Sequence, residues 1–97
     1  MKYSTVFGID SHARTTTICA LGTESGDTET RTFRNDYEEM SKWMARFPTP
    51  AIGVYEAGCT GYVPARRLTR GDVLVVSLEA RESITNWKLG LLSAVAR

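Results

Sequence analysis

Residues 2–21 read KYSTVFGIDSHARTTTICAL, and this stretch decides the fold. The segments Tyr3–Ile9 and Thr15–Leu21 are rich in β-branched and aromatic residues, which favour β-strands. The five residues between them, Asp10–Arg14, have a length that suits the turn of an antiparallel hairpin. We therefore expect two paired strands, with Asp10 placed where the first apolar strand ends.

A third strand and a helix are expected next. Residues 28–34, TETRTFR, alternate in residue type and are predicted to form an edge strand that completes a three-stranded meander. Asp36 followed by Glu39 resembles the capping box that begins many helices. Apolar residues then recur on one helical face until Pro48 ends the helix. These face residues are Tyr37, Met40, Trp43, Met44 and Phe47.

The second half of the chain alternates between strands and helices. The apolar segments 51–55, AIGVY, and 72–78, DVLVVSL, are predicted strands, and residues 64–70 between them form a predicted helix. The order strand–strand–strand–helix–strand–helix–strand predicts an α/β fold with a mixed sheet. Residues 1–78 then form one domain, and residues 79–97 form a helical C-terminal tail. The tail residues with helical spacing are Ile84, Trp87, Leu91 and Val95.

The composition is that of one small globular domain. The chain has 97 residues, of which 42% are hydrophobic and 24% charged, and its net charge is +1. A charge so close to zero gives no overall basic field that would indicate nucleic acid binding. No apolar run approaches the roughly 20 residues of a membrane helix, and the N-terminus lacks a signal peptide pattern. Two cysteines and one histidine are too few for a disulfide framework or a zinc site, so we expect a reducing, cytoplasmic setting. The lack of a long apolar run further predicts a protein without membrane contact.

Two acidic residues, Asp10 and Glu56, directly follow apolar strands. If the first and fourth strands are parallel neighbours, about 4.8 Å apart, both carboxylates lie at the same edge of the sheet. Ligands of open α/β sheets bind outside the carboxyl ends of the strands. Oxygen ligands suit Mg²⁺ or Mn²⁺, and such ions assist phosphodiester cleavage. The alternatives are that Asp10 caps its turn and that Glu56 interacts with the N-terminus of the following helix.

Five further residues are candidates for contacts with nucleic acid. His12 lies two positions after the first acid, and Arg14 lies in the same turn. Arg66, Arg67 and Arg70 form a basic cluster on the predicted second helix, where they would follow a phosphate backbone. The alternatives are an exposed histidine without a function and a solvated arginine face.

Two segments resemble the DEDD transposase family of circle-forming insertion sequences. FGIDSHARTTTICAL resembles the opening of the family's RuvC-like domain. IGVYEAGCTGYVPARRL, which follows an F-R-N-D segment and a helix, resembles a later part of the same domain. The resemblance extends from Lys2 to Val76 and implies an RNase H-like (RuvC-like) fold. It further implies that Asp10 and Glu56 are catalytic acids and metal ligands, that Mg²⁺ or Mn²⁺ is the cofactor, and that DNA is the substrate.

The chain departs from that family in its acidic residues and its extent. The family uses two further aspartates after the fifth strand, whereas residues 79–97 contain Glu79 and Glu82 but no Asp. The family's C-terminal domain, with its catalytic serine, has no counterpart in these 97 residues. The resemblance therefore implies a truncated transposase domain that binds metal weakly and is inactive alone, so its status as an enzyme stays open. In the intact family a structured guide RNA directs strand exchange on DNA, and such an RNA is an implied partner.

Two other functions fit parts of the same sequence. Actin-like and sugar-kinase ATPases also open with a G-I-D strand and a Thr-rich hairpin that holds phosphate, but His12 stands where they have glycine. A non-catalytic interaction protein would instead use the apolar tail residues, from Ile84 to Val95, to bind a second copy or a full-length transposase. Binding of ATP with Mg²⁺ would indicate the first alternative, and self-association the second.

Overall fold

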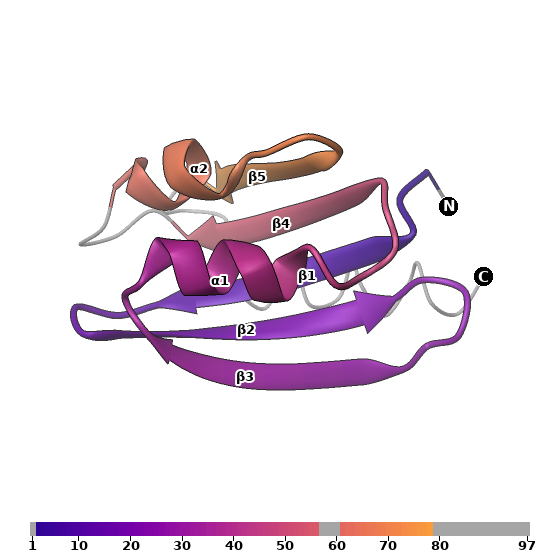
Figure 1. Cartoon of the computed structure of the whole chain (residues 1–97), viewed down its shortest axis with the longest axis horizontal. Helices are drawn as coiled ribbons and strands as arrows, with labels where there is room; N and C mark the ends of the chain where they lie inside the picture. The colour runs from indigo at the N-terminus through magenta and orange to yellow at the C-terminus, as the bar shows by residue number, and fades with distance from the viewer. Residues whose placement is uncertain (1, 57–60, 79–97) are drawn as a thin grey trace.

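The computed structural model describes residues 2–56 and 61–78. The described chain forms five strands and two helices (Figure 1). In chain order they are β1 Thr5–Ser11, β2 Thr15–Gly22, β3 Thr28–Arg34, α1 Tyr37–Met44, β4 Ala51–Glu56, α2 Val63–Leu68 and β5 Val73–Leu78. The α/β class with a mixed sheet is confirmed, whereas the predicted helical tail, residues 79–97, lies outside the described residues. Neither described helix is long and apolar enough to cross a membrane.

The five strands form one sheet in the order β3-β2-β1-β4-β5. The central strand, β1, lies between an antiparallel neighbour, β2, and a parallel neighbour, β4. The first three strands are joined by short turns, whereas the two parallel pairs need longer crossovers, which contain α1 and α2. The predicted parallel pairing of the first and fourth strands is confirmed. The carboxyl ends of β1, β4 and β5 therefore lie at the same edge of the sheet.

Both helices pack on the same face of the sheet (Figure 1). Asp36 caps α1 by accepting a hydrogen bond from the backbone N–H of Glu39 at 3.2 Å, as the capping-box pattern predicts. The apolar face of α1 then buries Met40, Trp43 and Met44 against the sheet. Alternate strand residues point toward the helices and complete this core. They are Phe7, Ile9, Ile18, Ala20, Phe33, Ala51, Tyr55, Val73 and Val75.

The hairpin between β1 and β2 is tighter than the sequence predicts. β1 continues through Ser11, so Asp10 lies inside the strand and not in the turn. The strand is longer because its pairing with β2 continues from Asp10, opposite Thr17, to Ser11, opposite Thr16. The turn is thereby reduced to residues 12–14, and Asp10 has the fixed backbone of a paired strand residue.

The second helix is shorter than predicted, and it ends at Leu68, before Arg70. Thr69 is extended, and its hydroxyl bonds to both backbone groups of Val75 in β5, at 3.0 Å from the nitrogen and 3.3 Å from the oxygen. A turn at Gly71, whose φ of 55° suits glycine, then leads into the strand. The prediction that Arg70 lies on the helix is therefore wrong, because the Thr69 side chain diverts the backbone toward the sheet.

An ion pair connects α1 to the segment before β5. The Arg70 guanidinium donates a hydrogen bond to Glu38 Oε1 at 2.6 Å, and both side chains are more than half exposed. This hydrogen bond, together with the charge of Arg70, holds the pKa of the Glu38 carboxyl below its usual value of 4.5. A carboxyl with a lowered folded pKa contributes stability above its unfolded pKa, and the contribution is lost as pH falls through the folded value.

We therefore expect Glu38→Gln to lower the Tm slightly near neutral pH, and this difference from the unsubstituted chain to disappear as pH falls below about 4.5. Thermal melts over this pH range measure it. Glu24→Gln, at an exposed carboxyl without an ion pair in the described residues, is the matched control. A Tm difference for Glu38→Gln that does not change with pH would contradict the assignment.

Candidate metal centre at the strand ends

Asp10 and Glu56 lie at the same edge of the sheet on neighbouring parallel strands. The register of β1 and β4 pairs Ile9 with Tyr55, and the two acids are the next residue on each strand. Because adjacent strands are about 4.8 Å apart, the acids are neighbours across this pair. The strand pairing thus brings together the two acids that the sequence singled out.

Both acids belong to the face of the sheet that points away from the helices. Side chains alternate between the two faces of a strand. Ile9 and Tyr55, at 1% and 0% exposure, lie in the core beneath the helices, so the following residue on each strand points the other way. The Asp10 side chain is 54% exposed, and Glu56 is half-buried. Solvent ions therefore have access to at least one carboxylate of the pair.

His12 is placed beside the first acid, as its spacing in the sequence suggested. Its Nε2 lies 3.2 Å from Asp10 Oδ2, and its side chain is 63% exposed. Contacts between such exposed groups are weak, so His12 lies beside the Asp10 carboxylate without burying it. Arg14, in the same turn, is exposed and forms no ion pair within residues 2–56 and 61–78.

Asn35, directly after β3, holds the turn that follows Asp10. Its Nδ2 donates hydrogen bonds to the carbonyl oxygens of His12 and Ala13, at 3.0 and 3.1 Å. Its Oδ1 accepts a hydrogen bond of 2.6 Å from the Thr16 hydroxyl, which belongs to a residue only 1% exposed. Asn35 therefore satisfies a buried hydroxyl and fixes the hairpin at the same time. Sequence patterns identified it only as a residue preceding a helix.

Tyr55 ties the start of α2 to the end of β4. Its hydroxyl donates a hydrogen bond to the carbonyl oxygen of Gly61 at 2.8 Å and accepts one from the N–H of Ala65 at 3.3 Å. The side chain is fully buried, so both contacts are shielded from water. The strand end that carries Glu56 and the first turn of α2 are thus held together. The sequence places Tyr55 at the end of an apolar strand but does not predict these partners, because both depend on where α2 packs.

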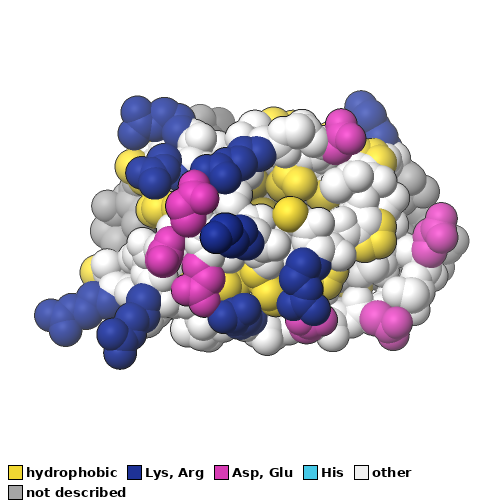
Figure 2. Space-filling view, viewed as in Figure 1, with side chains coloured by type: hydrophobic (Ala, Val, Ile, Leu, Met, Phe, Trp, Pro, Cys, Tyr) yellow, Lys and Arg dark blue, Asp and Glu magenta, His cyan; other side chains and the backbone are white. Residues whose placement is uncertain are grey.

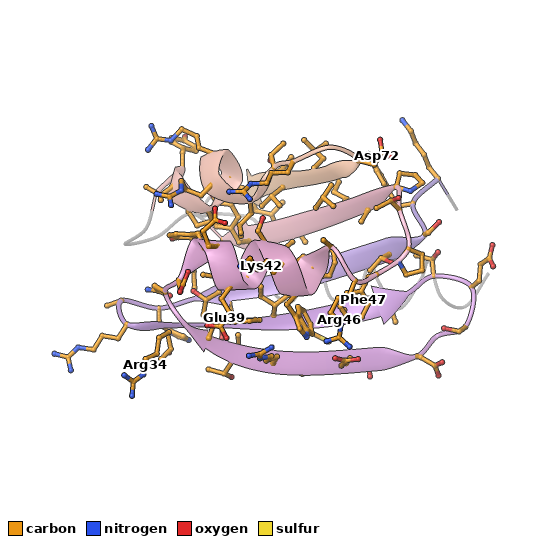
Figure 3. All side chains as sticks on the ribbon, viewed as in Figure 1. Arg34, Glu39, Lys42, Arg46, Phe47 and Asp72 are labelled. Carbon is orange, nitrogen blue, oxygen red and sulfur yellow. The ribbon has the colours of Figure 1, made fainter. Side chains whose placement is uncertain are left out.

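The arginines predicted to contact nucleic acid lie on α2 and just beyond its end. Arg66 and Arg67 are exposed on α2, and the Arg67 guanidinium lies 5.5 Å from the centre of the Tyr37 ring. Arg70 lies beyond the helix and is engaged in its ion pair. Arg34, at the end of β3, extends at the sheet end where the β1–β2 hairpin lies (Figure 3). Lys and Arg side chains gather over the helices and toward that end of the sheet (Figure 2).

The two acids fit a magnesium or manganese ion better than other metals. Mg²⁺ keeps several waters and is commonly held by one or two carboxylates. Within residues 2–56 and 61–78, no three His, Cys, Asp or Glu side chains gather into a metal-binding group. A metal ion at this edge of the sheet would therefore have at most the carboxylates of Asp10 and Glu56 as acidic ligands from the described residues.

Comparisons of the chain with models of protein families and with curated proteins found no match. What the chain does must therefore be inferred from its own residues and their arrangement.

Proposed function

We propose that this chain is the N-terminal RuvC-like domain of a DNA transposase of the DEDD family, with an RNase H-like fold, and that Asp10 and Glu56 are its metal-binding acids. The observation that supports this most directly is the position of both acids at the carboxyl ends of adjacent parallel strands. The sequence resemblance assigns the family's first two acids to the same positions. Both lines of support concern the same two residues, although one comes from motifs and the other from strand pairing.

On this proposal each described residue of the site has a separate role. The carboxylates of Asp10 and Glu56 bind Mg²⁺ or Mn²⁺, an ion that supplies electrostatic stabilisation at a DNA phosphate when bound. His12 restricts the orientation of the Asp10 carboxylate through its contact of 3.2 Å. Asn35 and Tyr55 are positioning residues, because they hold the backbone on either side of the acid pair.

The proposal assigns metal binding to this chain and DNA cleavage to the intact family. Two carboxylates are half of the acid set that the family uses, and the remaining coordination sites would be taken by water. Affinity for the ion is therefore expected to be low, and metal-dependent cleavage of DNA by these 97 residues alone is not expected.

The test of the proposal is Mn²⁺ binding by the whole chain, measured by electron paramagnetic resonance of the free ion. Each carboxylate supplies both a ligand atom and a negative charge. We expect Asp10→Ala and Glu56→Ala each to weaken Mn²⁺ binding by at least about tenfold, since loss of an outer-shell partner alone costs that much in metal sites.

Asp72→Ala is the matched control for the metal experiment. Asp72 is an exposed acid just before β5, so it lies at the opposite edge of the sheet from the acid pair. Its removal changes the net charge equally but should leave Mn²⁺ affinity unchanged. Equal affinity in Asp10→Ala, Glu56→Ala and Asp72→Ala would overturn the assignment of the metal site.

A further inference from the structure

Tyr62 is an exposed aromatic residue at the start of α2. Its side chain is 70% exposed, and the other large apolar residue found exposed within residues 2–56 and 61–78 is the aliphatic Leu74. Core packing therefore does not account for an aromatic ring at position 62. Exposed aromatic residues on a fixed backbone are the usual platforms on which unpaired nucleobases stack.

The backbone that carries Tyr62 is fixed on both sides. The buried Tyr55 hydroxyl donates a hydrogen bond to the carbonyl oxygen of Gly61, and the Tyr55 hydroxyl oxygen accepts one from the N–H of Ala65. The carbonyl oxygen of Tyr62 itself accepts the first helical hydrogen bond, from the N–H of Arg66 at 3.1 Å. The ring is thus exposed on an ordered turn, so binding a ligand there requires little rearrangement.

Arg66 supplies a positive charge four residues after Tyr62, on the short helix α2. Residues four apart are neighbours on a helix surface, with Cβ atoms about 5–6 Å apart. Arg66 is exposed, and it belongs to none of the ion pairs found among the described residues. An exposed ring with an exposed guanidinium four residues later provides one surface for a base and one donor group for its phosphate.

This ring and this charge lie at the sheet edge that carries the two acids. Tyr55, which holds the residue before Tyr62, is the immediate neighbour of Glu56 on β4. Figure 1 shows the start of α2 at the same end of the sheet as the arrowheads of β1 and β4. Because α2 packs on one face of the sheet and the acid pair points to the other, a DNA strand held at Tyr62 would have to pass around this end of the sheet to reach the acids.

We propose that Tyr62 and Arg66 form a binding site for one unpaired nucleotide of single-stranded DNA, with the base stacked on the ring and the phosphate on the guanidinium. The inference deepens the proposed DNA function and depends on it for its biological meaning. Single-stranded DNA is specified because both faces of a base in a duplex are covered by neighbouring bases, so the ring has no free face to stack on.

The experiment measures the affinity of the whole chain for a short fluorescent oligothymidine by anisotropy, in the presence of EDTA. We expect Tyr62→Ala to weaken binding by roughly 5- to 150-fold, the range found when stacking residues are replaced by alanine. Tyr62→Phe, which keeps the ring, should stay within about twofold of the unsubstituted chain. Tyr62→Leu, which keeps an apolar side chain without a ring, should behave like Tyr62→Ala.

The phosphate contact is tested by the dependence of affinity on salt. Loss of one contact to single-stranded DNA should reduce the slope of log affinity against log salt by about 0.7. We expect this change in Arg66→Gln but not in Arg46→Gln, which removes an exposed charge after the end of α1. Figure 3 labels Arg46 on the helix-bearing face of the molecule.

Three results would overturn the nucleotide site: no binding of the oligothymidine, affinity for a duplex equal to that for the single strand, or equal affinities in Tyr62→Ala and the unsubstituted chain. Because EDTA removes divalent ions, failure here is independent of the Mn²⁺ measurement, which uses no DNA. If the chain binds Mn²⁺ but not the oligothymidine, only the nucleotide site is rejected. If it binds the oligothymidine but not Mn²⁺, only the metal site is rejected.

Discussion

Replacement of Trp43 by alanine is expected to lower the free energy of unfolding by about 3–5 kcal/mol, the usual cost of removing a large aromatic side chain from a core. Trp43 is 3% exposed at the centre of the interface between α1 and the sheet. Its ring centre lies 4.8 Å from that of Phe47, 5.6 Å from that of Phe33 and 6.3 Å from that of Phe7. Trp43 thus lies near aromatic rings from β1, from β3 and from the segment after α1.

The loss is large relative to the whole, because a domain of this size has a free energy of unfolding of roughly 5–15 kcal/mol. Urea unfolding followed by circular dichroism at a peptide-backbone wavelength measures it without depending on tryptophan fluorescence. Trp43→Phe should lose less, because it keeps an aromatic ring in the same place. Lys42→Ala, at the exposed neighbouring position, is the control and should change stability by less than about 0.5 kcal/mol. A Trp43→Ala variant as stable as Lys42→Ala would show that α1 does not pack as described.

The elements of this fold are predictable where local propensity and burial agree. The face of α1 repeats apolar residues at helical spacing, and Asp36 marks its start, so both the helix and its buried side follow from periodicity. β3, by contrast, buries only Phe33. Its alternating residue types still predict a strand, and the short turn before it makes β2 its neighbour in the sheet. The parallel half follows from the order of elements, since strands separated by helices cannot pair as hairpins.

Features that depend on contacts between distant residues could not be read from the sequence. Whether Asp10 lies in a strand or a turn is decided by its pairing with Thr17. Arg70 lies beyond the end of α2 because Thr69 bonds to Val75, and it pairs with Glu38, which lies 32 positions away. The local sequence shows that these residues are polar and lie near the end of a strand or helix, but the tertiary structure determines which residues they contact.

The residues of the candidate site were likewise predictable only in part. The juxtaposition of Asp10 and Glu56 was predictable because each lies at the end of a recognisable strand and the element order makes those strands parallel neighbours. The positioning roles of Asn35 and Tyr55 were not, since their partners are backbone groups of other elements. An asparagine before a helix resembles an ordinary cap residue, and a tyrosine in an apolar strand resembles an ordinary core residue.

Replacement of Asn35 by alanine is expected to destabilise the domain by about 2–3 kcal/mol and to loosen the β1–β2 hairpin in particular. Three side-chain hydrogen bonds are lost, each with a net contribution of about 0.5–1.5 kcal/mol. The buried Thr16 hydroxyl also loses its acceptor at 2.6 Å and keeps only a longer contact of 3.4 Å with the Ser11 hydroxyl, which adds part of the cost of an unsatisfied group. Hydrogen exchange should therefore accelerate most at the amide of His12, which bonds to Thr15 across the turn, and at the amide of residue 35, which bonds to Arg14 in the turn.

A double-mutant cycle with Thr16→Val separates the buried hydroxyl from the rest of the Asn35 network. Thr16→Val alone leaves the Asn35 carbonyl without its donor, whereas in the Asn35→Ala background it removes a hydroxyl that has already lost its shorter hydrogen bond. Because a hydrogen-bonded pair replaced on both sides costs less than one replaced on a single side, Thr16→Val should destabilise the double mutant less than it destabilises the unsubstituted chain, by about 1 kcal/mol. Additive losses would mean that the two side chains act independently.

Equal acceleration of exchange at the β4 and β5 amides would mean that Asn35 stabilises the whole sheet and not the turn after Asp10. The predicted pattern, with exchange confined to the hairpin, would instead make Asn35 a residue that positions the first acid, and Mn²⁺ affinity should then fall in Asn35→Ala although neither carboxylate has been changed.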